Sequence, residues 1–428
     1  MQFSILGVTK EAEPDLTELK TFSGKNAGIC YQGDKYYNTS VSDPEKAFSR
    51  FSRVANTGHH SISDHAQVTV LLEGISKMMA MVLNSLGYYA TSEKSGRYTV
   101  MTGNSDKEKE LYEKWLEIFK VQIKQNEPNL NETLIIKLAQ ENARYVLSVF
   151  TRSTTMSYTT SLRQWNYIYD WCLKYMKHYE VNGDKVYSIN DNNEASYYEA
   201  ELYKDFSALS DFIAKNLYVD ELRDNKNRAF DFLGGFSGSD FTPILSYRLA
   251  EYNFEDESIN ESVENDDKLD FNYSVSYWAS FVHIAQAQRH RTLTYWMTFS
   301  PYNEARFFVP PIIRNTEFEK VWLEDLNSIK DVVPQATMFE VIETGTLDKF
   351  ILKCEERLCG RAQLEIMQQT KKTVERFRDH YSILSPIAKE YIGRLLSSGA
   401  RVRTKCELLD SCKEPCRFGF RNALNRNI

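Results

Sequence analysis

Two arginines flank a histidine in the stretch QAQRHRTLT, residues 286–294. If the apolar run before it forms a helix over 275–291, Gln286 lies one turn before Arg289 and His290, so these side chains share a face near the helix C-terminus. The helix dipole favours cations there, so a basic helix end is one interpretation. Arginine also offers a planar fork of donors that suits a phosphate, a pyrimidine carbonyl or the anionic ring of a reduced flavin. Two such forks around an imidazole suit a site where negative charge develops.

Two stretches in the first half of the chain contain further groups that could do chemistry. The stretch TSEKSGRYT, residues 91–99, reads in isolation as a turn with a basic residue. The stretch GHHSISDH, residues 58–65, offers four side chains that could hold a metal ion or could be structural: His59, His60, Asp64 and His65. Neither stretch decides a function by itself.

The segments that must position these groups have the same outline. Residues 66–86 pass from a strand-like start to a helical run, and residues 272–291 do the same. The offset between them is about 204 residues, which predicts two diverged copies of one unit rather than two unrelated domains. The acidic segment 255–270 reads as a solvated insertion.

Length and charge narrow the class of protein. A chain of 428 residues exceeds the usual size of a single core. A net charge of -7 argues against a nucleic-acid or membrane-surface footprint and leaves room for a local basic pocket that binds a phosphorylated small molecule. The sequence shows neither a signal peptide nor a long apolar run, so we expect a cytoplasmic protein without a membrane span.

Four motifs together resemble the flavin-dependent thymidylate synthases. The stretch 289–294 resembles their Arg-His-Arg-x-x-Ser signature, with Thr294 in place of Ser. Residues 58–65 resemble a Gly-His-x-Ser-x-x-Glu-His element, and residues 75–98 align without a gap to the segment that ends in Glu-x-Ser-x-Arg-Tyr. The stretch RLCGRAQLEI, residues 357–366, resembles an Arg-x-x-x-x-Ala-Gln-x-Glu-Ile element.

The resemblance implies an α+β fold of two tandem synthase-like repeats that form a pseudo-dimer. The expected domains are residues 1–215, which carry the phosphate-gripping half-site, and residues 216–385, which carry the Arg-His-Arg half-site. A cysteine-containing tail, residues 386–428, matches neither repeat.

Each repeat has lost a different set of the family's residues. Where Arg-His-Arg is expected, the first repeat has Ser85-Leu86-Gly87, and where the second repeat should match Arg144 it has Lys330. Arg357 aligns roughly with Trp171. The first repeat retains Glu93, Ser95, Gly96, Arg97 and Arg144, and the second retains Gln286, Arg289, His290, Arg291 and Arg357. Since the family assembles each site at a subunit interface, we expect composite sites in a homodimer that mimics a tetramer, with the halves meeting within or between chains.

The resemblance also implies the chemistry. Such an enzyme transfers a one-carbon unit from methylenetetrahydrofolate to C5 of dUMP, and FAD reduced by NADPH supplies the hydride. Arg289, His290, Arg291 and Arg357 are then the catalytic set, with Arg289 and Arg357 on the pyrimidine and the Arg-His-Arg residues on the flavin. Ser95, Arg97 and Arg144 hold the phosphate, Glu93 orients the nucleotide, and Gln286 belongs to the substrate-binding set. His59, Ser61 and Asn166 match flavin-contacting positions, as does Cys30 more loosely.

Two alternatives to this activity stay open. The departures Lys94, Thr294 and Asp64 leave room for a related C5 modification, such as hydroxymethylation of dUMP or dCMP. The second alternative is a non-catalytic relic that binds nucleotide or flavin. Such a relic would have no need to retain both complementary sets of site residues.

Cysteines near the end of the chain form a separate hypothesis. Cys354 and Cys359 bracket Arg357, and three more follow in the tail: Cys406, Cys412 and Cys416. Four thiolates of this set could form a structural zinc site that ties the tail to the loop carrying Arg357. Reduced thiols and a redox pair are the alternatives.

Overall fold

The computed structural model divides the chain into two compact units, each of which collects segments that are far apart in the sequence. Unit 1 contains residues 1–75, 86–94 and 154–229, and unit 2 contains residues 76–85, 95–153 and 230–428. The structure describes residues 15–31, 43–85, 89–97, 99, 101, 103–223, 272–298, 305–384, 386–409, 418–419 and 422–428. The acidic segment 255–270 lies outside this description. Because the units interleave, the consecutive division into 1–215 and 216–385 stays a prediction.

Unit 1 is built on an antiparallel sheet with the strand order β1-β3-β2. Its strands are β1 (Gln67–Ile75), β2 (Tyr89–Glu93) and β3 (Thr154–Ser161). Buried and exposed side chains alternate along β3, as the twofold period of a strand requires. Tyr158 of β3 lies opposite Val70 of β1 and Thr91 of β2, and its ring stacks on Tyr89 with centroids 5.4 Å apart. These cross-strand contacts fix the register of the sheet.

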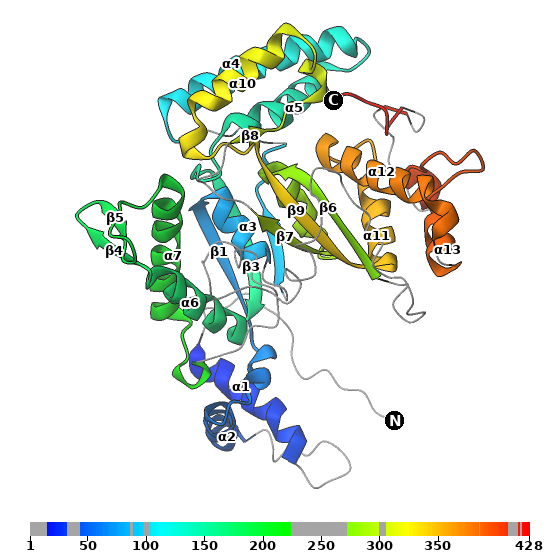
Figure 1. Ribbon diagram of the computed structural model, residues 1–428. Coiled ribbons are helices and arrows are strands. Elements are labelled where there is room, and N and C mark those ends of the chain that lie inside the picture. Colours follow the sequence, from blue (N-terminus) through cyan, green and yellow to red (C-terminus); the bar gives the residue numbers. More distant parts are fainter. Residues whose placement is uncertain are drawn as a thin grey trace. The chain divides into compact units, whose positions relative to one another are not determined.

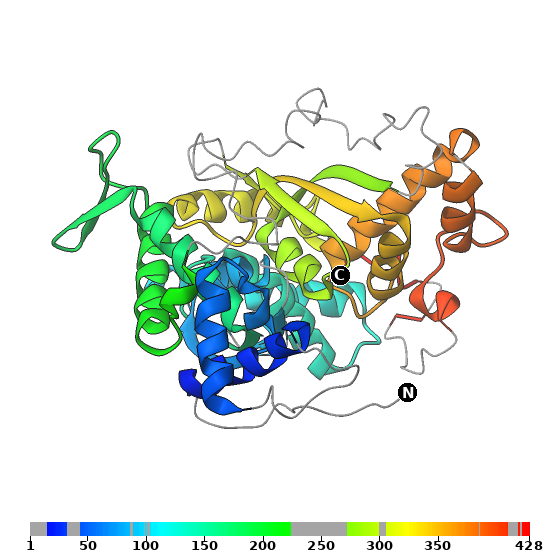
Figure 2. The same cartoon turned by 90° about the horizontal axis from the view of Figure 1, so that it is seen from below.

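The helices of unit 1 enclose a small apolar core. They are α1 (Leu16–Gly28), α2 (Pro44–Asn56), α6 (Leu162–Met176) and α7 (Tyr197–Asn216), with short 3-10 turns η1 (Ile29–Tyr31), η3 (His60–Asp64) and η5 (Asp220–Leu222). The buried core residues are Phe51, Ala55, Ala66, Leu162, Val219 and Leu222. A hairpin of β4 (Tyr179–Asn182) and β5 (Lys185–Ser188) follows α6, and it projects away from α6 and α7 in Figure 2.

Unit 2 contains a second antiparallel sheet, with the order β6-β9-β7 and β8 paired to β9. Its strands are β6 (Asn272–Ser280), β7 (Thr294–Thr298), β8 (Arg306–Phe307) and β9 (Thr337–Thr346). Val275, Tyr277 and Ala279 alternate along β6 and are buried. Three helices accompany this sheet in Figure 1: α9 (Phe281–Ala287), α11 (Leu347–Arg357) and α12 (Leu364–Asp379).

The helix predicted over 275–291 is shorter than expected. Residues 275–280 continue β6 by pairing with β9, and the helix begins only at Phe281. The Ser280 hydroxyl accepts a hydrogen bond from the His283 amide at 3.3 Å and so caps the first turn of α9. The last turn tightens into the 3-10 helix η6 (Gln288–His290), which ends at Arg291 in the left-handed conformation with φ 52°.

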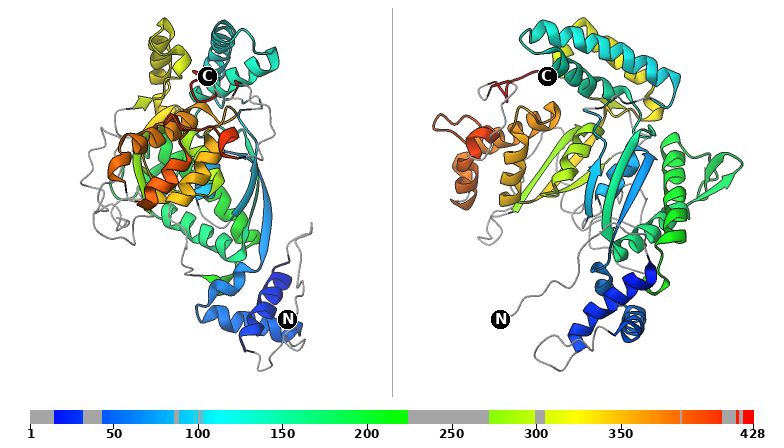
Figure 3. Two further views of the ribbon diagram at one scale, coloured as in Figure 1. Left: turned by 90° about the vertical axis from the view of Figure 1, so that its right-hand side faces the viewer. Right: turned by 180° about the vertical axis from the view of Figure 1, so that it is seen from behind.

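A helical layer of unit 2 contributes to an extended apolar core among the described residues. Figures 1 and 3 show α4 (Asp106–Asn126) beside α10 (Glu317–Ser328), with α5 (Glu132–Ala143) next to α4. Trp115 of α4 meets the ring of Trp322 edge to face, with centroids 4.6 Å apart, and both rings are fully buried. Aromatic pairs in this geometry are stabilising beyond the area they bury. The remaining elements of unit 2 are α3 (Lys77–Ser85), α13 (Pro386–Arg394), α14 (Lys405–Leu408), η4 (Arg144–Val146), η7 (Pro311–Ile313), η8 (Lys330–Val332) and η9 (Tyr381–Ile383).

The two sheets have the same strand order, in which the last strand in sequence lies between the first two. In both, a helix follows the first strand, and a 3-10 turn, η4 or η8, precedes the last. Within unit 2 the chain after η4 pairs with the chain after η8: the Val149 amide donates to the Val333 carbonyl at 3.0 Å, and the Gln335 amide donates to the Leu147 carbonyl at 2.8 Å. This pairing is reciprocal, as between two equivalent segments.

The predicted α+β class is confirmed, because helices and antiparallel sheets occur together in each unit. None of the helices in the described ranges is long and apolar enough to cross a membrane.

Candidate functional site

Residues predicted for the two half-sites lie together in unit 2. Arg97 donates from Nη2 to the backbone carbonyl of Arg361 at 2.5 Å, four residues beyond Arg357. The pKa of Arg357 is lowered to about 10, mainly by burial, and the nearby charges of Arg97 and Arg289 contribute to this lowering. Arginines from both halves of the sequence are therefore close enough to interact within one chain.

Arg97 is held by contacts on both sides of its guanidinium. Its Nε atom forms an ion pair with Glu141 Oε2 of α5 at 2.8 Å, and both side chains are nearly buried. The Ser95 hydroxyl accepts a hydrogen bond from the Arg97 amide at 3.3 Å, which shapes the turn before it. Gly96 lies against Arg144, because a Cβ atom at this position would come within 3.4 Å of Arg144 Cδ and Nη1. The turn of Ser95 and Gly96 therefore lies in direct contact with the Arg144 side chain.

Arg144 follows α5 in η4, and its side chain is 4% exposed. Its Nε and Nη2 atoms have no hydrogen-bond partner among the residues that the structure describes. Burial lowers the pKa of Arg144, and the charge of Glu141 acts in the opposite direction. Buried charged donors without acceptors are costly, so this arrangement favours an anionic oxygen as their partner.

Glu365 connects the turn of Arg144 to the helix that leads to Arg289. Its Oε1 atom accepts from the Ser280 amide at 2.8 Å, and its Oε2 atom accepts from the Ser280 hydroxyl and the Tyr145 hydroxyl, each at 2.7 Å. Burial raises the pKa of Glu365, and the hydrogen bonds from Ser280 and Tyr145 oppose this rise. One carboxylate of α12 therefore aligns η4 with the N-terminus of α9.

We expect Glu365→Gln to lower the free energy of unfolding by about 1–3 kcal/mol. The glutamine amide nitrogen is a donor, and it would face a donor group from which the carboxylate oxygen accepts a hydrogen bond. Urea unfolding of the ligand-free protein measures this change. Glu375→Gln is the matched control, since Glu375 lies on the same helix and its ion pair with Lys371 is part-exposed. Equal unfolding midpoints for the two variants would contradict the connecting role of Glu365.

A second buried network, from β6, β9 and α11, supports α9. Tyr277 donates its hydroxyl proton to Glu343 Oε2 at 2.7 Å, and Glu343 also pairs with Lys353 of α11. The hydroxyl has only one proton, so the contact of 3.1 Å between His283 Nε2 and the Tyr277 oxygen requires His283 to donate. Burial holds the pKa of His283 well below its usual value, and the charges of Lys353 and Arg357 lower it further. The imidazole is therefore neutral.

The Arg-His-Arg turn follows directly from this anchored helix. The backbone carbonyl of Gln286 accepts from Arg357 Nη2 at 2.5 Å, which joins α9 to α11. Arg289 is partly exposed and Arg291 is exposed, whereas the side chain of His290 lies outside the description. The Arg289 guanidinium is thus accessible beside the buried Arg357.

The other predicted site residues belong to unit 1. Glu93 ends β2, and His59 and Ser61 are exposed at η3. Asn166 is fully buried in α6, where its amide donates to the Leu162 carbonyl at 2.9 Å and its oxygen accepts from the Val219 amide at 2.8 Å. These contacts give Asn166 a structural role in unit 1, and its predicted contact with flavin stays a prediction.

The cysteines do not form a metal cluster in the described part of the chain. Cys354 is buried, which raises its pKa well above the usual value, while Cys359 is half-buried and Cys406 is exposed. Cys412 and Cys416 lie outside the described residues, so the zinc hypothesis is not tested. No group of three metal-binding side chains occurs among the described residues, which include His59, His60, Asp64 and His65.

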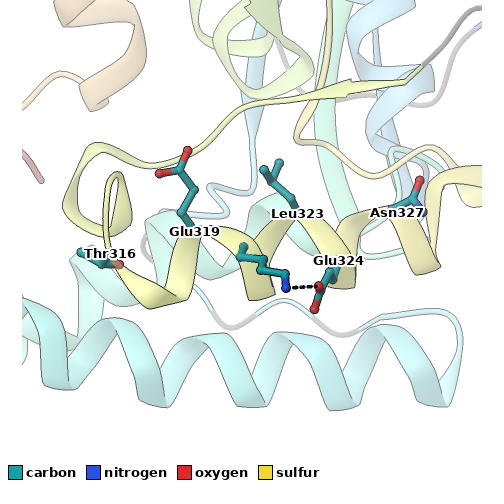
Figure 4. A pocket seen from close by; sticks show the side chains of 6 residues that line it. Thr316, Glu319, Leu323, Glu324 and Asn327 are labelled. Atoms are coloured by element: carbon teal, nitrogen blue, oxygen red, sulfur yellow. Dashed lines mark ion pairs between the residues drawn. The ribbon is translucent and has the colours of Figure 1, made fainter.

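A shallow depression lies elsewhere in unit 2, along one face of α10. Figure 4 shows the side chains that line it. Lys320 and Glu324 form an ion pair of 3.7 Å there. The lining residues are Thr316, Glu319, Lys320, Leu323, Glu324 and Asn327. None of them belongs to the predicted site, and their helical spacing is that of one solvent-facing surface.

Comparison with known proteins agrees with the motifs of the first half. Residues 21–182 match the family described as "Thymidylate synthase complementing protein". This part of the chain is therefore similar to the flavin-dependent thymidylate synthases. A curated relative, the "Flavin-dependent thymidylate synthase" of Pyrococcus furiosus, is 27% identical over 151 residues, which cover 32% of this chain and 59% of the relative. The chain thus spans less than two thirds of that synthase, and Arg289 and Arg357 lie beyond the matched residues 21–182.

Proposed function

We propose that this chain is a flavin-dependent thymidylate synthase-like enzyme that transfers a one-carbon unit from methylenetetrahydrofolate to C5 of dUMP, with FAD reduced by NADPH. The observation that carries the proposal is the buried guanidinium of Arg144, whose Nε and Nη2 atoms have no partner in the described structure. Arg97 and Arg357 lie in the same unit, so an anionic nucleotide would meet several cations at once.

The phosphate of the nucleotide would bind between Ser95 and Arg144. The charge of Arg97 is already partly compensated by Glu141, whereas Arg144 offers donors without acceptors. Charge-assisted hydrogen bonds to a phosphate are short and about twice as strong as neutral ones. Arg144 would therefore provide most of the phosphate affinity.

The pyrimidine ring would face Arg357 and Arg289. Arg357 is 7% exposed, so its charge acts in a medium of low dielectric, where it polarises a carbonyl more strongly than in water. Its hydrogen bond to the Gln286 carbonyl keeps the guanidinium in place before substrate binds. Negative charge that develops on the ring would be stabilised without reorganisation of the protein.

The donor set around the Arg-His-Arg turn fits FAD. Two cations, Arg289 and Arg291, are accessible there and suit an anionic flavin ring. We propose that they hold the cofactor together with His290. The flavin contacts of His59, Ser61 and Asn166 stay predictions from the sequence motifs. When bound, reduced FAD supplies the hydride that completes the new methyl group.

We further propose that the chain is a tandem duplication that forms a homodimer equivalent to a tetramer. The shared strand order of the two sheets and the reciprocal pairing of 147–149 with 333–335 support this proposal. Size measurement in solution tests the dimer. In this arrangement the arginines of both repeats would serve one site within the same chain.

The experiment combines spectroscopy with product analysis. The purified protein should show a flavin spectrum and should oxidise NADPH in the presence of methylenetetrahydrofolate and dUMP, giving dTMP by mass. We expect Arg97→Ala and Arg289→Ala each to abolish dTMP formation, because each removes a cation from one half of the site. The exposed Arg314→Ala is the control and should retain activity.

Other outcomes of the same experiment separate the alternatives. Flavin binding with a product other than dTMP, or turnover of dCMP, would move the function to a related C5-modifying enzyme. A colourless protein that does not bind added FAD would exclude the enzyme activity altogether.

A further inference from the structure

Residues 422–428 pack beside the site although they lie outside the matched residues 21–182 and outside every synthase-like motif. Ala423, Leu424 and Ile428 are at most 6% exposed. Ile428 belongs to the same apolar core as Tyr145 and Trp322, so this segment is part of the folded core of unit 2. Its most unusual side chain is Arg426, a charged group that is 5% exposed.

Arg426 binds backbone carbonyls of the loop that follows Arg357. Its Nη1 atom donates to the Cys359 carbonyl at 3.2 Å, and its Nη2 atom donates to the Ala362 carbonyl at 2.5 Å. Further donations go to the carbonyls of Ala423 at 3.0 Å and Ile428 at 2.6 Å. The planar fork of arginine suits this geometry, because its donors point in fixed directions and can hold two carbonyls of one loop.

The loop 358–362 is shaped largely by groups from elsewhere in unit 2. The Leu358 carbonyl accepts from the Lys405 amide at 2.7 Å, and the Arg361 carbonyl accepts from Arg97. Within the loop itself the Ala362 amide donates to the Cys359 carbonyl at 3.1 Å. Arg426 and Arg97 therefore hold neighbouring carbonyls of the same five-residue loop, the first from the tail and the second from the nucleotide-binding turn.

We propose that Arg426 is a positioning residue for nucleotide binding, acting through the loop 358–362 on Arg97 and Arg357. This inference rests on the proposed function. If Arg426 is removed, the Ala362 carbonyl loses this donor, the Cys359 carbonyl keeps only the Ala362 amide, and the loop loosens. The Arg361 carbonyl then no longer fixes the Arg97 guanidinium, and Arg357, which precedes the loop, loses its support. A displacement of about 1 Å in such groups can lower activity on the order of 100-fold.

The test compares Arg426→Gln and Arg426→Lys with Arg401→Gln. Arg401 is the matched control, because it lies in the same tail and its ion pair with Glu407 is on the surface. Lysine retains the charge but has no planar fork, so Arg426→Lys should recover only part of the function. Hydrogen exchange of the ligand-free proteins reports on loop 358–362 without any nucleotide, and titration with dUMP reports on the site.

We expect amides of the loop to exchange at least about tenfold faster in Arg426→Gln than in the wild type, with no change in Arg401→Gln. The KM for dUMP should rise at least about tenfold in Arg426→Gln, while kcat at saturating dUMP changes less, because bound nucleotide restores the loop. Arg426→Lys should lie between the wild type and Arg426→Gln in both measurements.

The wild type provides a second measurement should the variants fail to fold. Binding of dUMP should slow exchange in residues 95–97, in loop 358–362 and in residues 422–428 together. If dUMP slows exchange in residues 95–97 and in loop 358–362 but not in residues 422–428, the proposal is overturned. It is also overturned if Arg426→Gln folds and has the same KM for dUMP and the same loop exchange as Arg401→Gln. If the wild type binds neither dUMP nor dCMP, the proposed function fails, and loop exchange in the ligand-free variants still decides whether Arg426 holds the loop.

Discussion

Replacing Arg144 by methionine should abolish nucleotide binding while the ligand-free protein becomes no less stable. The Arg144 guanidinium is buried, and two of its nitrogens have no partner in the described structure. Two charge-assisted hydrogen bonds to a phosphate contribute about 3 kcal/mol or more, so their loss should weaken dUMP binding roughly 100-fold or more. Methionine fills much of the same volume and removes a buried charge whose donors lack acceptors, so the free energy of unfolding without ligand should not fall.

Calorimetric titration with dUMP and urea unfolding measure the two effects of Arg144→Met separately. Lys330→Met is the matched control, because Lys330 begins the corresponding turn η8 and is exposed. Lys330→Met should change neither the affinity for dUMP nor the free energy of unfolding. Unaltered dUMP affinity in Arg144→Met, or a large loss of stability in the absence of ligand, would exclude the phosphate-binding role of Arg144.

The second large effect is expected at the buried pair of Lys353 and Glu343, whose side chains are 3% and 0% exposed. Lys353→Met should lower the free energy of unfolding by about 3–5 kcal/mol, because it leaves the Glu343 carboxylate buried without its cation. The double variant Lys353→Met with Glu343→Leu should recover most of this loss. In the double variant the Tyr277 hydroxyl loses its carboxylate acceptor together with the ion pair, but it can still bond to His283.

Urea unfolding of the wild type, both single variants and the double variant forms a complete mutant cycle. Lys320→Met is the control, since its ion pair with Glu324 is exposed, and it should change stability by less than about 0.5 kcal/mol. Additive losses in the double variant would be incompatible with a direct coupling between Lys353 and Glu343. A selective rise in the KM for dUMP in partly active single variants would link this network to the position of α9.

Local patterns of the sequence predict much of the fold and the residue types of the site. The α+β class and the passage from strand to helix in residues 66–86 and 272–291 follow from the spacing of apolar side chains, and the structure has both. In the second segment the helix begins later than the sequence predicts, because residues 275–280 also fit a strand and pair with β9. Such pairing depends on residues about 60 positions away in the sequence, so a local pattern does not contain it.

The assembly of the site depended on contacts that no local pattern encodes. The sequence left open whether the two half-sites meet within a chain or between chains, and the structure brings Arg97, Arg144, Arg289 and Arg357 into one unit. The motifs drew attention to arginines but not to the carboxylates that place them: Glu141 looks like an ordinary helix residue, and Glu343 lies in a strand. The role of Arg426 cannot be predicted from a motif, because it donates to backbone carbonyls, which every residue has. Residue type and spacing determined which chemistry was possible, whereas long-range packing decided which charges are buried, paired and close together.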